Sequence, residues 1–212
     1  MAQNDKQIDK QDNKSKILDC ALELFYERGY EGVGVQEIAQ SAGITKPTLY
    51  YYFKSKYGLL ESVLAEFIPE FIEALEETIA KSTSLEDTLN NVAKEYIRRG
   101  VRRKKSFYLF ISLAYSPKES DSHKAVSEYT TRLFGVFKSI FTKNEKLLGN
   151  MNGRQEQFAM GFMGILNYYL LVHYEKTENE ESIVTGATKA IANVSDKEIY
   201  SIVHQFMHGI FS

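Results

Sequence analysis

The chain has 212 residues, of which 43% are hydrophobic and 13% aromatic, so it can bury a core and is not a disordered protein. Its formal net charge of −2 excludes a protein that coats nucleic acid over its whole surface, although a local basic patch is compatible with that total. The single cysteine, Cys20, excludes an internal disulfide and is typical of a small core residue.

Residues 1–13 are predicted to form a disordered arm. Ile8 is the only large aliphatic residue there after the initiator Met, so the segment lacks the apolar stretch of a secretory signal. The longest apolar stretch of the chain, Phe158 to Val172, is too short to cross a bilayer and contains the polar Asn167. We therefore expect a cytoplasmic protein with no membrane partner.

Apolar residues recur three and four positions apart along the chain, whereas runs that alternate apolar and polar residues are missing. This pattern predicts an all-α fold of about nine helices, with a three-helix N-terminal head followed by a larger helical domain. The first helix is predicted over residues 14–28 and ends at Gly29. A short second helix is defined by apolar residues at helical spacing, namely Val35, Ile38, Ala39 and Ala42.

The third and fourth helices have clear N-terminal signals. Thr45 is a suitable N-cap for the third helix, which tolerates Pro47 in its first turn. Ser55 is the expected cap of the fourth helix, which should continue to a kink near Pro69.

Turn residues and caps divide the rest of the chain. A helix is predicted to begin at Ser84, and Pro117 interrupts the chain further on. An apolar helix covers residues 154–174, and the acidic stretch after it is expected to be an exposed loop or a ragged helix end. The last helix, over residues 196–211, opens with a capping box formed by Ser195 and Glu198.

Residues 35–53, VQEIAQSAGITKPTLYYYF, match a helix-turn-helix with Gly43 in the turn. Leu49 and Phe53, four residues apart, are predicted to pack inward. Because successive helical residues lie about 100° apart, Tyr50 and Tyr51 must then point outward. The alternative is that these tyrosines are ordinary surface aromatics or fill a protein interface.

The charge pattern favours a nucleic-acid contact. No acidic residue occurs between Glu37 and Glu61, whereas this segment contains three lysines. Two of them, Lys46 and Lys54, would form one outward ridge with Tyr50. Lysine attracts phosphate, and tyrosine offers a hydroxyl to a phosphate and a ring to a sugar or a thymine methyl group.

Residues 14–60 resemble the N-terminal DNA-binding domain of the TetR family of transcriptional regulators, most specifically in the segment AGITKPTLYYYFKSKYGLL. The resemblance implies a DNA-binding domain over residues 14–60 and an effector-binding and dimerisation domain over residues 61–212. It further implies a homodimer that binds double-stranded operator DNA and whose DNA binding changes when a small-molecule effector binds.

The resemblance also implies which residues contact DNA. Tyr52 occupies a position that is commonly histidine in the family, so a phosphate donor is kept and a positive charge is lost. Lys56 would hold a phosphate at the N-terminus of the fourth helix, where backbone N–H groups add to the attraction. The full DNA-binding set is Gln36, Thr45, Lys46, Pro47, Thr48, Tyr50, Tyr51, Tyr52 and Lys56.

An effector pocket would be lined by aromatic and apolar residues with a few hydroxyl and amide groups. Core packing is the alternative for any one of them. The effector is expected to be largely apolar or aromatic, or a cationic drug that sits on aromatic faces. The candidate ligand-binding residues are Tyr96, Phe107, Tyr108, Phe110, Ile111, Tyr115, Phe137, Phe158, Phe162, Asn167 and Tyr168.

The family resemblance implies a four-helix dimer interface, which the last two helices are expected to build. Gly161 and Gly164 on the apolar helix would allow another helix to approach closely, as in a four-helix bundle. The alternative is that this helix belongs to the core of a monomer.

The basic run RRGVRRKK, Arg98 to Lys105, has three interpretations. Cations are favoured at a helix C-terminus, so it can be a solvated face. It can also contact the acidic first helix, or hold a phosphate or an anionic ligand.

The sequence shows no catalytic motif, so we predict no enzymatic activity and no cofactor. His204 and His208 have a spacing that can bind a metal ion, but no further ligand can be identified, and no metal site is predicted. The predicted function is a transcriptional regulator, most simply a repressor that an effector releases from a palindromic operator. The alternatives are an activator, a constitutive DNA-binding protein without an effector, and a helical enzyme that carries this head.

Overall fold

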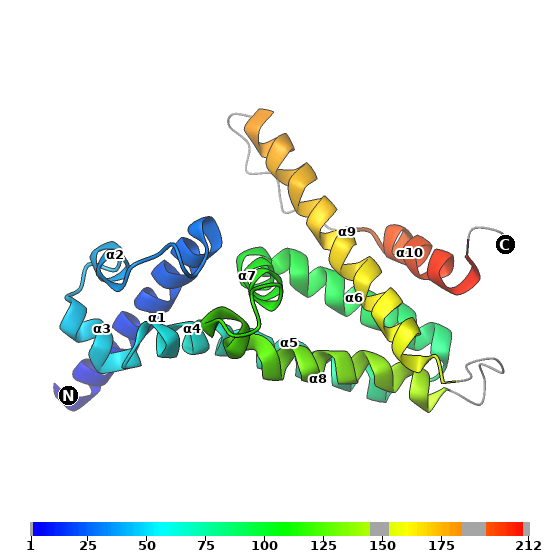
Figure 1. Cartoon of the computed structure of the whole chain (residues 1–212), viewed down its shortest axis with the longest axis horizontal. Helices are drawn as coiled ribbons and strands as arrows, with labels where there is room; N and C mark the ends of the chain where they lie inside the picture. Colours follow the sequence, from blue (N-terminus) through cyan, green and yellow to red (C-terminus); the bar gives the residue numbers. More distant parts are fainter. Residues whose placement is uncertain (1, 145–152, 184–193, 210–212) are drawn as a thin grey trace. The chain divides into compact units, whose positions relative to one another are not determined.

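The structure, a computed structural model, describes residues 2–144, 153–183 and 194–209, with side chains from residue 13 onward except for residues 177–183. Within these ranges every regular element is a helix, which confirms the predicted all-α fold (Figure 1). The helices are α1 (Ala2–Arg28), α2 (Val35–Ser41), α3 (Lys46–Phe53), α4 (Lys56–Ala65), α5 (Ile68–Lys81), α6 (Leu85–Arg102), α7 (Lys104–Ala114), α8 (Asp121–Lys143), α9 (Gln155–Ile183) and α10 (Asp196–His208). Among the described residues, none of the helices has the length and apolarity of a membrane span.

The helix starts agree with the caps expected from the sequence. The side chain of Thr45 accepts a hydrogen bond at the start of α3, and that of Ser55 does so at the start of α4. Ser84 and Ser195 cap α6 and α10 in the same way. These caps satisfy backbone N–H groups that have no partner within the helix.

Several helix bounds differ from the expected ones. Helix α1 begins at Ala2, so the structure places residues 2–13 in a helix where an arm is predicted. That segment contains neither glycine nor proline, so nothing in it stops helix propagation backward from the packed part. Helix α4 ends at Ala65, so it does not reach the kink expected near Pro69. Pro69 instead lies in the first turn of α5, a position where proline is well tolerated.

The C-terminal helices also differ in their bounds. Helix α9 continues to Ile183 through the acidic stretch that was expected to be a loop or a ragged end. Helix α10 ends at His208, and the following Gly209 has a φ of 74°, a left-handed conformation that favours glycine. Residues 210–211 of the predicted last helix lie outside the described part of the chain.

The chain divides into two compact units. The first consists of Met1–Pro69 and Lys105–Thr130, and the second of Glu70–Lys104 and Thr131–Ser212. The first unit therefore contains the predicted DNA-binding domain, residues 61–69 of the predicted C-terminal domain, and most of α7. Helix α7 belongs there because Tyr108 packs on Tyr26 of α1, with ring centroids 5.4 Å apart, and Lys105 pairs with Glu23.

The core of the first unit is built from one face of each of its first helices. Helix α1 contacts α2 and α4, and α3 contacts α2 and α4 (Figure 1). The fully buried residues include Ile17 and Ala21 of α1, Ile38 of α2, Leu49 of α3, and Leu59 of α4. Burying a leucine or phenylalanine side chain contributes about 1.5–3 kcal/mol relative to leaving it exposed, so these contacts fix α3 on its inner face.

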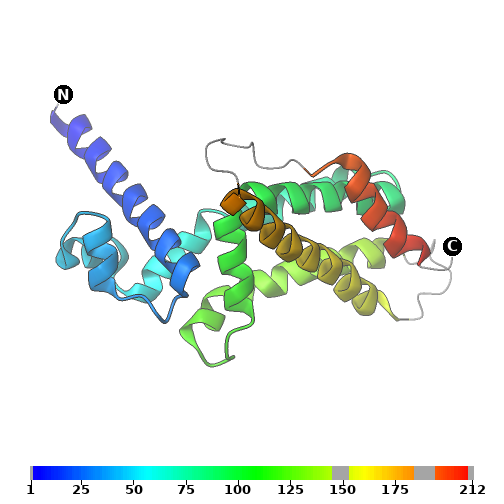
Figure 2. The same ribbon diagram turned by 90° about the horizontal axis from the view of Figure 1, so that it is seen from above.

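The second unit has a continuous row of aromatic rings in its core. Phe71 of α5 lies 5.1 Å from Tyr96 of α6, and Tyr96 lies 5.5 Å from Phe137 of α8. The row continues to Phe162 of α9 at 5.8 Å and to Phe206 of α10 at 5.0 Å. Helix α6 lies beside both α9 and α10, as Figure 2 shows. Ring pairs at these centroid distances attract one another in addition to burying area.

Candidate nucleic-acid interface

The turn between α2 and α3 is closed by backbone hydrogen bonds. The Gly43 N–H donates to the Gln40 carbonyl at 3.1 Å, and the Ile44 N–H donates to the Ala39 carbonyl at 2.9 Å. Gly43 has a φ of 68°, which a residue with a side chain adopts only with strain. The glycine therefore allows α3 to leave α2 at the sharp angle of a helix-turn-helix.

Helix α3 is anchored by its cap and by two buried residues. The Thr45 hydroxyl accepts from the Thr48 N–H at 3.3 Å, and the two hydroxyl oxygens lie 2.8 Å apart. Leu49 is fully buried and Phe53 nearly so, as the sequence predicts. Of these two hydroxyl groups, one donates to the other, so one proton is still available to donate a hydrogen bond to a phosphate.

The outer face of α3 presents tyrosine and lysine side chains. Tyr50 is 38% exposed and Tyr51 61% exposed, so both point outward as expected. The Lys46 ammonium lies 5.7 Å from the centroid of the Tyr50 ring. Gln36 of α2 and Pro47 of α3 are also exposed. This face combines charge, hydroxyl groups and rings at the position where a recognition helix meets a DNA groove.

The acidic residue beside this face is neutralised. Glu37, in the first turn of α2, forms an ion pair with Arg28 at the end of α1. A second contact between the same side chains joins Arg28 Nη2 to Glu37 Oε2 at 2.7 Å, and Nη2 also donates to the Gly32 carbonyl at 3.0 Å. The bidentate pair keeps the carboxylate from repelling a polyanion that approaches α3.

Lys54 has a structural role that the sequence did not reveal. Its φ of 67° ends α3 in a left-handed conformation, and its ammonium donates to the Tyr51 carbonyl at 3.1 Å. Its ammonium also lies 5.7 Å from the centroid of the Tyr51 ring. Lys54 thus closes the C-terminus of α3 instead of extending outward in a ridge with Lys46 and Tyr50.

The junction between α3 and α4 is unusually tight. The Phe53 carbonyl accepts from the Ser55 N–H at 2.7 Å, and the Gly58 N–H donates to the Ser55 hydroxyl at 2.9 Å. A Cβ atom added to Gly58 would lie 2.3 Å from the Phe53 carbonyl oxygen, which is closer than atoms can approach. Only glycine fits here, so this residue fixes the angle between the two helices.

The two remaining phosphate candidates are half-buried. The Tyr52 ring packs between those of Tyr51 and Phe53, at 5.3 and 6.1 Å. The Lys56 ammonium lies 4.2 Å from the centroid of the Tyr30 ring, and burial lowers its pKa while Glu31 and Asp121 oppose that effect. No sequence pattern predicts this contact, because Tyr30 and Lys56 come from separate segments.

The predicted ligand-binding residues are distributed over both units. Tyr96 and Asn167 are joined by a hydrogen bond from the tyrosine hydroxyl to the amide oxygen. The fully or nearly fully buried members are Tyr96, Phe137 and Phe162 in the second unit and Phe107, Phe110 and Ile111 in the first. Phe158 and Asn167 are half-buried, whereas Tyr108, Tyr115 and Tyr168 are exposed on the single chain.

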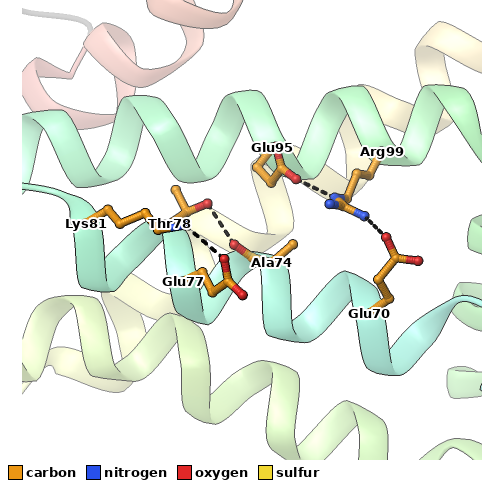
Figure 3. A network of polar contacts seen from close by, with 7 residues as sticks. All are labelled: Glu70, Ala74, Glu77, Thr78, Lys81, Glu95 and Arg99. Carbon is orange, nitrogen blue, oxygen red and sulfur yellow. Dashed lines mark hydrogen bonds and ion pairs between the residues drawn. The ribbon is translucent and has the colours of Figure 1, made fainter.

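The basic run is largely engaged in ion pairs within the chain. Arg99 pairs with Glu95 and also with Glu70 of α5, where its Nη1 lies 2.8 Å from Oε1 (Figure 3). The hydrogen bond from Arg99 lowers the pKa of Glu70. Figure 3 also shows the Lys81–Glu77 pair on α5. Arg98 pairs with Asp196.

The same run reaches the acidic first helix, which was one of the three interpretations. Lys105 pairs with Glu23 of α1, and its ammonium lies 6.0 Å from the centroid of the Tyr26 ring. Arg102 and Arg103 are exposed. The run therefore serves mainly to join helices.

The histidine pair on α10 does not form a metal centre with other residues. The His204 and His208 rings are 4.4 Å apart, yet the described part of the chain contains no group of three potential ligand residues around a common point. A protein site needs about three or four such ligands for zinc.

Comparisons with known proteins agree with this geometry. Residues 17–63 match the family model "Bacterial regulatory proteins, tetR family". The "Probable HTH-type transcriptional regulator YttP" of Bacillus subtilis (strain 168) is 39% identical over 79 residues, 37% of this chain and 38% of that protein. The chain aligns with only 35–42% of the length of the first three curated relatives.

Two other relatives align along almost the whole chain. The "Biofilm operon icaADBC HTH-type negative transcriptional regulator IcaR" of Staphylococcus aureus (strain Newman) is 24% identical over 207 residues, 92% of this chain and 98% of that protein. The crystal structure of the transcriptional regulator FadR from Bacillus subtilis in complex with stearoyl-CoA superposes with a TM-score of 0.70 and 19% identity, over 92% of this chain and 98% of that one. Residues 17–63 therefore match a domain of the tetR family of bacterial regulatory proteins, and the chain as a whole shares the fold of the solved FadR structure.

Proposed function

We propose that this protein is a DNA-binding transcriptional regulator that inserts α3 into the major groove of an operator. The observation that carries the proposal is the outer face of α3, where Lys46, Tyr50 and Tyr51 are exposed while Leu49 and Phe53 hold the helix from below. As a regulator of transcription it works in the cytoplasm, and we propose no catalytic role.

The proposed DNA-binding residues divide between contacts with bases and contacts with phosphates. Lys46 and Tyr50 meet base edges or the adjacent backbone, together with Gln36, Pro47 and Thr48. The hydroxyl groups of Tyr51 and Tyr52 donate to phosphates. Lysine contacts with phosphate release counterions, so binding must weaken as the salt concentration rises.

The protein acts as a homodimer that forms through α9 and α10. On the single chain, Met160, Ile165 and Tyr168 of α9 and Tyr200 of α10 are 40–70% exposed although they are large and apolar or aromatic. Gly164 has no atom within 4 Å of its added Cβ position. Such a face is covered in a two-fold symmetric dimer, and two recognition helices about 34–36 Å apart then fit successive major grooves of a palindromic site.

The dimer is tested with a charge placed on this face. Ile165→Asp should convert the dimer into a folded monomer in sedimentation equilibrium and reduce operator affinity. Thr142→Asp, an exposed change on α8 and therefore outside the two proposed interface helices, is the control and should leave the dimer intact. A monomeric wild-type protein, or an Ile165→Asp variant that stays dimeric, contradicts the proposed interface.

The regulator is a repressor that a largely apolar effector releases from DNA. The second unit offers an aromatic core in which the Tyr96 hydroxyl and the Asn167 amide are a polar pair that a ligand can engage. The solved regulator FadR holds stearoyl-CoA, so this acyl-CoA is the first probe to use. Its binding should weaken the protein–operator complex because it favours a different spacing of the two heads.

The primary experiment is selection of binding sites from random duplex DNA, followed by affinity measurements on the selected site. Lys46→Ala and Tyr50→Ala should each weaken binding by about tenfold, or about 1.4 kcal/mol, which lies within the about 1–3 kcal/mol of one base contact. Lys118→Ala removes an exposed lysine from the same unit and should bind as the wild type does. Failure to select any sequence refutes the proposed function.

A further inference from the structure

The ammonium of Lys56 is held by the protein itself. It lies 4.2 Å from the centroid of the Tyr30 ring, within the range of a cation–π contact. Tyr30 is only 5% exposed, and Lys56 is half-buried. The charge therefore rests on a buried ring at the edge of the helix-turn-helix.

Two exposed carboxylates from separate segments act on this charge from beyond ion-pair distance. Glu31 follows Tyr30 in the loop between α1 and α2, and Asp121 is the first residue of α8. Both act on the ammonium, since they raise the pKa of Lys56 against the lowering effect of burial. With burial as the main cause, the same two acids help to raise the pKa of Tyr30 to about 12.

A hydrogen bond fixes one of the two acids. The Ser122 hydroxyl donates to Glu31 Oε1 at 3.1 Å, and Ser122 is 3% exposed. The loop after α1 thus contacts the start of α8 through this hydrogen bond and the start of α4 through the Tyr30 ring, all within the first unit. This arrangement holds Glu31 near Lys56 before any DNA is present.

A DNA phosphate and these carboxylates need the same cation. Lys56 is the first residue of α4, whose N-terminal N–H groups also attract an anion. A phosphate that approaches this helix end meets Glu31 and Asp121 as like charges. The closer the carboxylates are held to Lys56, the less of its charge is available to the phosphate.

We propose that Glu31 and Asp121 compete with an operator phosphate for Lys56, with Ser122 as the residue that positions Glu31, and that this competition lowers the DNA affinity of the protein. The proposal rests on the proposed DNA-binding function. It assigns to the start of α8 a part in DNA binding although α8 lies outside the helix-turn-helix.

A double-mutant cycle tests the competition. Glu31→Gln and Asp121→Asn should each tighten operator binding by about two- to fivefold, the range of one exposed charge–charge interaction. In a Lys56→Gln background the same substitutions should have no such effect, because the contested charge is gone. Affinity is measured by fluorescence anisotropy on one selected duplex at fixed salt concentration.

Two further variants separate competition from other effects. Glu119→Gln removes an exposed carboxylate two residues before Asp121 and controls for the loss of net negative charge; its effect should be equal in both backgrounds. Ser122→Ala keeps every charge and frees Glu31, so it should tighten binding by about twofold, and only when Lys56 is present. Thermal unfolding identifies any variant that does not fold.

The outcomes distinguish the two proposals. If the wild type binds the selected duplex but the acid substitutions weaken binding, or change it equally in both backgrounds, the competition is refuted and the DNA-binding function stands. If the wild type selects no DNA, the proposed function itself has failed. Coupling between Lys56 and both acids, with the tightening stated above, supports the competition.

Discussion

Gly58→Ala should destabilise the head of the protein, although alanine is the better helix former. Gly58 lies in the first turn of α4, and an added Cβ would be 2.3 Å from the Phe53 carbonyl oxygen. This oxygen cannot yield easily, because it belongs to the backbone and accepts the hydrogen bond from the Ser55 N–H at 2.7 Å. Either α3 or α4 must therefore move.

The expected magnitude follows from two opposing terms. Overpacking costs about 1–3 kcal/mol, and the rigid backbone oxygen places this substitution near the upper value. Replacing glycine by alanine in a helix gains about 1 kcal/mol. The net loss is about 2 kcal/mol, which lowers the melting temperature by about 4–8 °C if the chain unfolds as one cooperative unit.

Gly135→Ala is the matched control. Gly135 is also helical, in α8, but it is exposed and has no atom within 4 Å of its added Cβ position. Only the helix-propensity term acts there, so this variant should gain up to about 1 kcal/mol. Urea unfolding of both variants gives the comparison. If Gly58→Ala is as stable as the wild type or more so, the tight α3–α4 junction is not a constraint, and the reasoning is refuted.

The other predictions concern the head, the basic run and alkaline stability. Phe53→Ala should cost about 3–5 kcal/mol in urea unfolding because it empties a buried site, whereas Tyr50→Ala should weaken operator binding in a protein of nearly unchanged stability; the reverse result would contradict the assignment of faces. Replacing Arg102 and Arg103 with alanine should leave the operator affinity and its salt dependence unchanged, since the basic run mainly joins helices; a smaller salt slope would show a phosphate contact. The pKa of Tyr30 is raised from 10.0 to about 12 by burial, so its contribution to stability is present below pH 10 and is lost as the pH rises toward 12. Urea midpoints of the wild type should therefore fall between pH 10 and pH 12, and Tyr30→Phe should remove the part of this fall that is due to Tyr30. An equal fall in the variant would refute the role given to Tyr30.

Local features of this chain were predictable from the sequence because their causes are local. Thr45, Ser55 and Ser195 each cap the helix that follows, since a side-chain oxygen beside an N–H group depends only on neighbouring residues. The inward Leu49 and outward Tyr50 follow from helical periodicity alone. The family resemblance and the all-α fold rest on such patterns.

Features that join distant segments were not predictable. Lys56 packs on Tyr30, and Asp121 acts on its charge, only because α4, the loop after α1 and the start of α8 come together in the fold, and no spacing in the sequence encodes that arrangement. Likewise, the sequence marked Lys54 as an outward cation, but its left-handed backbone turns it back to the Tyr51 carbonyl. Residues 61–69 and 105–130 pack with the head through contacts of the same kind.

The salt dependence of operator binding by the wild type and by Lys46→Ala tests the central claim most directly. If the outer face of α3 contacts DNA, the wild type must bind a selected duplex with an affinity that falls as salt rises. Loss of the Lys46 charge should then reduce the slope of log K against log salt concentration by about 0.9 if the contact is to a phosphate, or lower the affinity at a single base-pair position if it is to a base. A Lys46→Ala variant with the wild-type affinity, slope and sequence preference would contradict the account.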